Sequence, residues 1–285
     1  MNDYRVSVVI PNYNNADYIE DCIVSIENQT YPIEEIIVVD DCSKDNSLEV
    51  LDKLAKEYDN LQVIALKENG GVSHARNTGL AAVKTPYVIF IDGDDIYLNS
   101  DKIKNEMALV KKYKEEFGKD IAAYSRTWYL TRDGVPYEGY RYRYKHYNQG
   151  NIFKRIVTDK YAFTIMRDYC FSAEYLRRVN GYDEKSCLWE DKDVILKLSK
   201  EIEFYYTGEI GTGYRQTQSG LSSKPAKTHI ERKREIFNNH TADFSKNKKT
   251  LYKVLKFIHK YENMFLIFWA RVKGKVRKIK GGIKK

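Results

Sequence analysis

Residues 1–125 alternate between apolar runs of strand length and segments with helical spacing. The apolar runs cover residues 6–10, 35–40, 61–66, 87–92 and 121–130. Between them, apolar residues recur at three- and four-residue intervals, as in the segments around Cys22 and Leu51. Continuous apolar runs are typical of strands buried on both faces, and strand–helix repeats form βαβ units. The pattern therefore predicts an α/β fold with one mainly parallel sheet flanked by helices.

The pattern changes after residue 130. Residues 131–165 are irregular and rich in Tyr, Arg and Gly, and we expect loops and short strands there. A helix is predicted to begin near Glu190, because Val194, Ile195 and Leu198 form an apolar face at helical spacing. The segment GEIGTGYR then predicts a strand, and it is followed by a Gly/Ser-rich loop.

Polar clusters follow the predicted strands at their carboxyl ends. PNYNN follows the first strand, DDCSKDNS the second, KENGG the third and DGDD the fourth. In sheets built from βαβ units, ligands bind at the carboxyl ends of the strands. The clusters therefore mark this edge of the sheet as the candidate site.

The cluster DGDD places Asp92, Asp94 and Asp95 within four positions. Like charges this close repel each other, and a divalent cation removes the repulsion. Mg²⁺ and Mn²⁺ prefer carboxylate oxygens and are often bound by one or two carboxylates together with substrate phosphates. The alternative is a polar loop that caps a helix starting near Asn99, but one aspartate would suffice for that. We favour a site for metal and phosphate.

Asp40 and Asp41 end the second predicted strand. A carboxylate here is suited to accept a hydrogen bond from a ring N–H of a base or from a ribose hydroxyl. The same cluster offers Ser43 or Asp45 as a cap for the helix that follows. Both roles are compatible, because they fall on adjacent residues.

Two further motifs bring charged residues to helix starts. In ENGGVSHARN, two glycines permit close approach to a ligand, and Arg76 with Asn77 follows one turn later. Arg76 is suited to pair with a phosphate or with an acidic neighbour in the site. In WEDKDV, Glu190 and Asp191 either favour the helix dipole or supply a general base.

The charge distribution separates the end of the chain from the rest. The net charge is +8, but residues 226–285 carry 18 of the 48 Lys and Arg residues and only 4 of the 40 Asp and Glu residues. We therefore expect two domains, 1–225 and 226–285, of which the second is a basic helical extension. Apolar residues at helical spacing from Leu251 to Phe265, followed by more basic residues, suit an amphipathic helix on an anionic membrane surface. The alternative is a helix packed on the first domain.

Several classes of protein are excluded by what the sequence lacks. The four cysteines have no metal-ligand spacing, no GxxxxGK[ST] phosphate loop occurs and no GxGxxG dinucleotide motif occurs. A phosphatase that forms an aspartyl phosphate would carry its DxD after the N-terminal strand. The N-terminus lacks a basic segment followed by a long apolar run, and MFLIFWA, at seven residues, is too short to span a bilayer. We expect a cytoplasmic protein, peripheral at the inner face of the cell membrane.

Taken together, the motifs VSVVIPNYNN, IIVVDDCSKDNS, ENGGVSHARNTGL, YVIFIDGDD and WEDKDV come in an order and spacing that resemble the family 2 glycosyltransferases. The resemblance covers roughly residues 4–222. It implies the GT-A fold, a single Rossmann-like, mainly parallel sheet flanked by helices. It also implies an inverting transfer of a sugar from a UDP-sugar, with Mn²⁺ or Mg²⁺ as cofactor.

The resemblance assigns roles to individual residues. Asp41 corresponds to the carboxylate that reads uracil, and Asp94 to a direct metal ligand, with Asp92 as second ligand near the ribose. Asp191 corresponds to the catalytic base and Glu190 to its partner. The expected donor site comprises Pro11, Tyr13, Asp40, Asp41, Arg76, Asn77, Asp92, Asp94 and Arg215.

The sequence departs from the family at two positions. Cys42 replaces the glycine of the frequent VDDGS motif, which we expect to have little consequence. Thr217 occupies the place of a histidine that helps to hold the metal or the diphosphate in many members. Arg215 remains, and we expect it to neutralise the diphosphate. No role is assigned to Asp95.

The expected partners are a UDP-sugar, a glycan or lipid-linked acceptor and an anionic membrane, with no nucleic acid. The expected process is synthesis of a bacterial surface polysaccharide. Two alternatives are a nucleotidyltransferase acting on sugar phosphates and a non-catalytic protein that binds anionic surfaces. The first would require a Gly-rich basic loop after the first strand, where PNYNNADY stands. The second leaves the acidic strand ends unexplained.

Overall fold

The computed structural model describes residues 3–137, 147–158, 168–185, 188–216 and 225–247. The chain divides into two compact units, residues 1–152 with 165–220 and residues 153–164 with 221–285. Among the described residues, no helix combines the length and the apolar character needed to cross a membrane.

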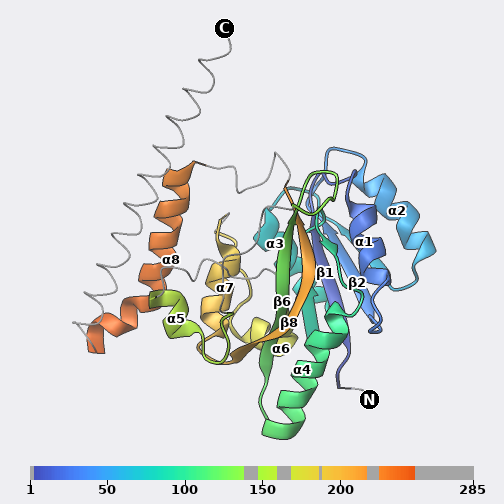
Figure 1. Ribbon diagram of the computed structural model, residues 1–285. Helices are drawn as coiled ribbons and strands as arrows, with labels where there is room; N and C mark the ends of the chain where they lie inside the picture. Colours follow the sequence, from blue (N-terminus) through green and yellow to red (C-terminus); the bar gives the residue numbers. More distant parts are fainter. Residues whose placement is uncertain (1–2, 138–146, 159–167, 186–187, 217–224, 248–285) are drawn as a thin grey trace. The chain divides into compact units, whose positions relative to one another are not determined.

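The described part of the first unit contains one eight-stranded sheet, with the strand order β3-β2-β1-β4-β7-β6-β8-β5 (Figure 1). The strands are β1 (Val6–Asn12), β2 (Glu35–Asp40), β3 (Leu61–Ala65), β4 (Tyr87–Phe90), β5 (Ile96–Tyr97), β6 (Ile121–Leu130), β7 (Tyr169–Ser172) and β8 (Glu203–Arg215). β1 pairs in parallel with β2 and β4, and β2 pairs in parallel with β3. The predicted βαβ units are thus confirmed.

The other half of the sheet was less predictable. β7 runs antiparallel to both β4 and β6, and β5 runs antiparallel to β8, whereas β6 and β8 are parallel. β7 has only four residues, which is too short for a periodic signal. The α/β class with flanking helices is therefore confirmed, and the sheet is mixed at the side that β7 joins.

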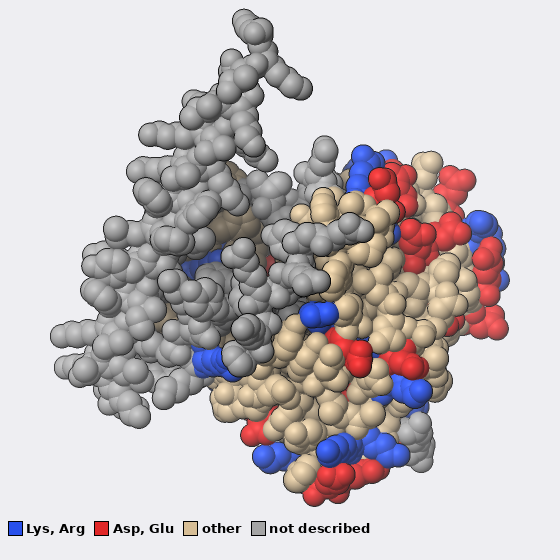
Figure 2. All heavy atoms as spheres, viewed as in Figure 1, with Lys and Arg blue, Asp and Glu red and all other residues tan. Residues whose placement is uncertain are grey.

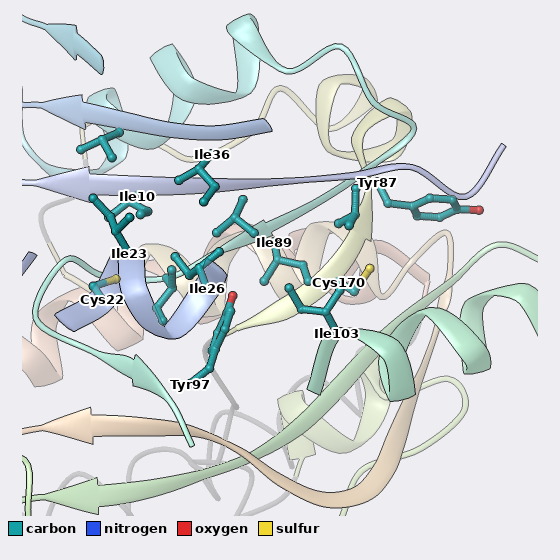
Figure 3. Packing of buried hydrophobic residues seen from close by; sticks show 14 of the residues in the cluster. Ile10, Cys22, Ile23, Ile26, Ile36, Tyr87, Ile89, Tyr97, Ile103 and Cys170 are labelled. Carbon is teal, nitrogen blue, oxygen red and sulfur yellow. The ribbon is translucent and has the colours of Figure 1, made fainter. Parts of the chain in front are cut away.

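Helices cover both faces of the sheet. α1 (Ile19–Glu27), α2 (Ser47–Glu57) and α4 (Lys102–Phe117) pack on the face that contains alternate β1 residues such as Val8 and Ile10. Figure 3 shows how Ile10, Ile23, Ile89 and other buried side chains meet there. The helices predicted around Cys22 and Leu51 are confirmed as α1 and α2, and the strands predicted at residues 6–10, 35–40 and 87–92 agree closely with β1, β2 and β4.

α3 (Val72–Ala82) lies on the opposite face. A Cβ atom at Gly79 would lie 2.3 Å from Cγ1 of Val9 and 3.3 Å from Cγ2 of Val39, which are side chains of β1 and β2. Glycine therefore lets the α3 backbone approach these two strands closely. α6 (Ala173–Arg178) follows β7 directly, and α7 (Glu190–Leu198) buries the predicted apolar face of Val194, Ile195 and Leu198.

In the second unit the structure describes α5 (Phe153–Thr158) and α8 (Ala226–Asn247). Ile156 on α5 and Ile236 and Phe237 on α8 are buried. α8 agrees with the helix predicted after Pro225, whereas α5 corrects the prediction of loops and short strands for that part of the chain. With six residues, fewer than two helical turns, α5 is too short to show a clear apolar period. The predicted membrane helix from Leu251 to Phe265 lies outside the described residues.

Charged side chains of both signs are interspersed over the visible face of the first unit (Figure 2). Acidic side chains gather over α1 and α2, at the right in this view. Among the exposed acidic residues of these two helices and of the turns before them are Asp17, Glu20, Asp21, Asp45 and Glu49. This agrees with the excess of acidic residues that the sequence shows before residue 226.

Candidate active site

The acidic turn after β4 is held in one compact conformation. The backbone N–H of Asp95 donates a hydrogen bond of 3.0 Å to the carbonyl of Asp92. One carboxylate oxygen from each of Asp92, Asp94 and Asp95 lies within 4.8 Å of the others. Gly93 permits close packing, since a Cβ there would lie 3.0 Å from Oδ1 of Asn12. β4 ends at Phe90, so the aspartates lie in a turn rather than in the strand.

Asp95 has a structural role that the sequence did not reveal. Only 1% of its surface is exposed, and Oδ1 accepts a 2.9 Å hydrogen bond from the backbone N–H of Arg215. The sequence offered as an alternative that an aspartate of this cluster caps the next helix, but none of the three occupies the cap position. α4 begins at Lys102, and its cap position is Asp101, whose N–H bonds to the side chain of Asn99.

Arg215 joins three segments around this turn. Its Nε donates to the carbonyl of Asp94 at 3.0 Å, and Nη1 donates to the carbonyl of Arg132 at 3.0 Å. Nη2 lies 3.1 Å from a carboxylate oxygen of Asp21 on α1. Arg215 is 4% exposed, so the structure places it beneath the acidic turn as a support. Its predicted contact with a diphosphate stays a prediction.

Arg76 connects the acidic turn with the start of α7. Nη2 lies 2.6 Å from Asp92, and Nη1 lies 2.8 Å from Glu190 and 3.1 Å from Asp191. The sequence left open a phosphate or an acidic neighbour as the partner of Arg76, and the structure gives it acidic neighbours. Burial lowers the pKa of Arg76, but the charges of Asp191, Asp92 and Glu190 outweigh burial and raise it well above its usual value. The guanidinium therefore stays charged.

Glu190 and Asp191 occupy the first turn of α7, where the helix dipole favours negative charge. Trp189 precedes them in a left-handed conformation, with φ of 61°, and turns the chain into the helix. Glu190 is buried, whereas 21% of the Asp191 side chain is exposed. Asp191 is thus the member of the pair that a reacting hydroxyl can reach, which suits the predicted base.

The carboxylates of Asp40 and Asp41 both accept hydrogen bonds from neighbouring groups of the protein. Asp40 accepts hydrogen bonds from Nδ2 of Asn12 at 2.8 Å and from Oγ of Ser43 at 2.6 Å. Asp41 accepts from the backbone N–H groups of Gly70 and Gly71, at 2.7 and 2.8 Å. Their carboxylates therefore shape the loops around the predicted base pocket. Asn12, the last residue of β1, belongs to the PNYNN cluster, but the sequence did not single it out from the other asparagines there.

Asn77 fastens a distant turn to α3. Its Nδ2 donates to the carbonyl of Tyr182 at 2.9 Å, and its Oδ1 accepts from the N–H of the same residue at 2.9 Å. Nδ2 also lies 2.8 Å from Glu184, which in turn contacts Nδ1 of His74 at 3.1 Å. Hydrogen bonds from Asn77 lower the pKa of Glu184, as does His74. The predicted place of Asn77 in a donor pocket stays a prediction.

Pro11 and Tyr13 lie at the carboxyl end of β1. Pro11 is buried and 45% of Tyr13 is exposed. An exposed aromatic ring beside the loops of Asp40 and Asp41 is suited to stack on a base. Thr217 lies outside the described residues.

The acidic turn fits a divalent cation. Hard cations such as Mn²⁺ and Mg²⁺ take carboxylate oxygens, and Asp92 and Asp94 are partly exposed while Asp95 is buried. Cys22 lies below this turn, with Sγ 3.7 Å from the carbonyl of Asp92. Burial raises the pKa of the Cys22 thiol, and the charges of Asp95, Asp94 and Asp92 raise it further. The field at the turn is thus negative, as a cation site requires.

The model of the family described as "Glycosyl transferase family 2" matches residues 7–178. The chain belongs to this family, and it is a glycosyltransferase. It is 35% identical, over 76% of its length, to the "Putative teichuronic acid biosynthesis glycosyltransferase TuaG" of Bacillus subtilis (strain 168) and covers 81% of that protein. It is 31% identical, over 86% of its length, to "Minor teichoic acid biosynthesis protein GgaB" of the same strain and covers 26% of it.

Solved structures confirm the fold. The crystal structure of S. aureus TarS 1-349 in complex with UDP-GlcNAc matches with a TM-score of 0.62 and 25% identity, covering 81% of this chain and 65% of that one. TarS 1-349 in complex with UDP matches with a TM-score of 0.58 and 21% identity. The chain therefore has the GT-A fold of these enzymes, as the resemblance of the motifs implied.

Proposed function

We propose that the protein transfers a sugar from a UDP-sugar to a hydroxyl of a cell-wall polymer of the teichoic or teichuronic acid type. The observation that carries this proposal is the meeting of the acidic turn with Glu190 and Asp191 around Arg76. The names of the relatives TuaG and GgaB support the polymer class. The UDP-GlcNAc bound by TarS supports a UDP-sugar donor, hexosyl or N-acetylhexosaminyl.

The proposed reaction is a direct displacement with inversion. Asp191 accepts the proton of the acceptor hydroxyl, and the hydroxyl oxygen of the acceptor attacks the anomeric carbon. The bond from that carbon to the phosphate oxygen breaks, and UDP leaves with the electron pair. Asp94 and Asp92 would hold Mn²⁺ or Mg²⁺, which when bound offsets the charge that develops on the departing diphosphate.

The donor is proposed to lie along the carboxyl ends of β1, β2 and β4. Tyr13 and Pro11 flank the base, and the loops shaped by Asp40 and Asp41 close around it. Arg76 and Asn77 border the sugar end, and Arg215 faces the diphosphate from beneath the acidic turn. This arrangement follows from the positions of the strand ends, where ligands of such sheets bind.

Residues 226–285 are proposed to act as a separate basic domain at the inner face of the cell membrane. Its 18 Lys and Arg residues against 4 Asp and Glu residues support contact with anionic lipid. Such contact would bring the enzyme to a lipid-linked acceptor.

Hydrolysis of a panel of UDP-sugars, with Mn²⁺ present, tests the proposed function. We expect one sugar to be released faster than the others, with UDP as the second product. Asp94→Ala should lower this rate at least about tenfold, because a metal-binding carboxylate is removed. Asn99→Ala serves as control, since Asn99 lies after the acidic turn and its side chain accepts a hydrogen bond from the N–H of Asp101, the residue before α4. Failure to use any UDP-sugar would contradict the proposal, and release of pyrophosphate from UTP incubated with a sugar 1-phosphate would favour a nucleotidyltransferase instead.

A further inference from the structure

We propose that Arg76 is a positioning residue that fixes the catalytic base Asp191 relative to the acidic turn at Asp92. This inference rests on the proposed function and goes beyond it, because it concerns the distance between the base Asp191 and the acidic turn at Asp92. The side chain of Arg76 is 4% exposed, and its contacts are with carboxylates of the protein. Its Nη1 and Nη2 atoms contact carboxylates from two separate segments.

α3, which carries Arg76, is fixed to the sheet. Gly79 lets the helix lie directly against Val9 and Val39 on β1 and β2. At the other end of α3, Gly70 and Gly71 donate their N–H groups to the carboxylate of Asp41, which follows β2. The backbone of Arg76 is therefore held at a constant place above the strand ends.

The segment bearing the base is attached to α3. Asn77 binds both backbone polar groups of Tyr182, and Nζ of Lys197 on α7 donates to the carbonyl of Gly181 at 3.2 Å. The Tyr182 ring packs edge-on against Phe90 of β4, with ring centroids 5.2 Å apart. The Arg76 guanidinium lies 5.2 Å from the same ring. These contacts place the start of α7 within reach of Arg76.

The guanidinium of Arg76 contacts carboxylates of both segments. Nη2 contacts Asp92 at 2.6 Å, while Nη1 contacts Glu190 at 2.8 Å and Asp191 at 3.1 Å. Arginine presents its N–H groups in a rigid planar fork, whereas lysine is a point charge on a flexible stem. A lysine at this position has one nitrogen to share among the same carboxylates. The distance between the base Asp191 and the carboxylate of Asp92 is therefore set by the planar fork of the Arg76 guanidinium and not by its charge alone.

The consequence for the reaction is specific. An inverting substitution at the anomeric carbon requires the base on the face opposite the leaving group. A shift of about 1 Å in the position of the base costs on the order of 10²-fold in rate. A loss of the fork therefore lowers kcat for transfer. Binding of UDP depends on the strand-end loops and on Asp94, so it should change much less.

Steady-state transfer by Arg76→Lys tests the proposal, with UDP affinity measured on the same protein. We expect kcat to fall about 10²-fold while the Kd for UDP in the presence of Mn²⁺ changes less than about threefold. Arg177→Lys is the matched control, because Nη2 of Arg177 binds the carbonyls of Leu80 and Val83 at the far end of α3. The control should retain wild-type kcat.

A double-variant cycle with Glu190→Gln separates positioning from a general structural effect. If Arg76 acts through the start of α7, the losses in kcat should be strongly non-additive, because both variants break the same link. Additive losses, or a Kd for UDP that rises as much as kcat falls, would overturn the proposal. If the wild type itself fails to transfer from any UDP-sugar, the proposed function fails instead, so the two failures are distinguishable.

Discussion

Two clusters of buried charge in the first unit have opposite designs. In the cluster around Lys102, Nζ lies 2.9 Å from Glu106, the pair is 1% and 0% exposed, and Ser125 completes it with a 2.7 Å hydrogen bond. In the cluster around Arg76, three carboxylates share one guanidinium, and Asp92 and Asp191 are 22% and 21% exposed. In the first cluster the lysine and the glutamate pair with each other and are closed to solvent. The second has an excess of negative charge that faces solvent.

This difference distinguishes a structural ion pair from an active site. A buried pair is tolerated when each charge has its partner and its remaining hydrogen bonds. An excess of carboxylates is unfavourable by itself and becomes favourable when a cation or a reacting proton arrives. Burial of charge alone thus does not mark the active site, whereas uncompensated and partly exposed charge does.

The largest effect is expected from Asp191→Asn. The substitution removes the proposed base and should lower transfer by about 10³-fold, since a general base contributes on the order of 10²–10⁴-fold. UDP affinity should stay nearly unchanged, because the amide keeps the shape of the side chain. Steady-state kinetics and a UDP titration on the same variant measure both quantities. Turnover at the wild-type rate would show that Asp191 is not the base.

Lys102→Met should act on stability. The substitution leaves Glu106 buried without its cation and should cost about 3–5 kcal/mol in the free energy of unfolding. Burial raises the pKa of Glu106 and Lys102 opposes this, so without Lys102 the carboxyl takes up a proton more readily. The cost should therefore be full at pH 8 and shrink as the pH falls. Urea unfolding at pH 8 and pH 5 gives both values.

The matched control for this prediction is the double variant Lys102→Met/Glu106→Gln, which removes both charges and should recover part of the stability. The folded fraction of each variant should bind UDP as the wild type does. A loss of UDP affinity without a loss of stability would mean that this cluster belongs to the site, and the distinction between the clusters would fail.

The smallest effect is expected from Ser125→Ala. Its hydroxyl donates to Oε1 of Glu106, and a hydrogen bond to a charged group contributes about 1.5–3 kcal/mol. The expected loss of stability lies at the lower end of this range, because Lys102 remains as a partner of Glu106. Thermal unfolding measures it, and an unchanged midpoint would show that the hydroxyl contributes nothing to the closed cluster.

Of the two clusters, the acidic residues of the one around Arg76 could be predicted from the sequence. DGDD after a predicted strand and WEDKDV at a predicted helix start are both visible in the sequence as clusters of acidic residues, and the topology of βαβ units places the first of them at the ligand edge. The burial of Lys102 and Glu106 was not predictable, because charged residues are normally exposed and alternate here with the apolar face of Ile103 and Met107.

The contacts between distant segments were likewise outside what a pattern reveals. Arg76 and Asp191 are 115 positions apart, and nothing in their local sequences indicates that they meet. Asn77 was expected beside the donor, yet it binds the backbone of Tyr182. Asp95, which had no assigned role, supports Arg215. Motif identity predicted which residues gather at the edge, whereas the partner of each depended on the tertiary fold.

We propose that the acidic turn forms a cation-dependent site for a uridine diphosphate. Titration calorimetry of UDP into the full-length protein, first with Mn²⁺ and then with a chelator, measures this dependence. We expect binding of UDP with Mn²⁺ and a loss of at least about tenfold in affinity after chelation. Absence of UDP binding under both conditions would contradict it.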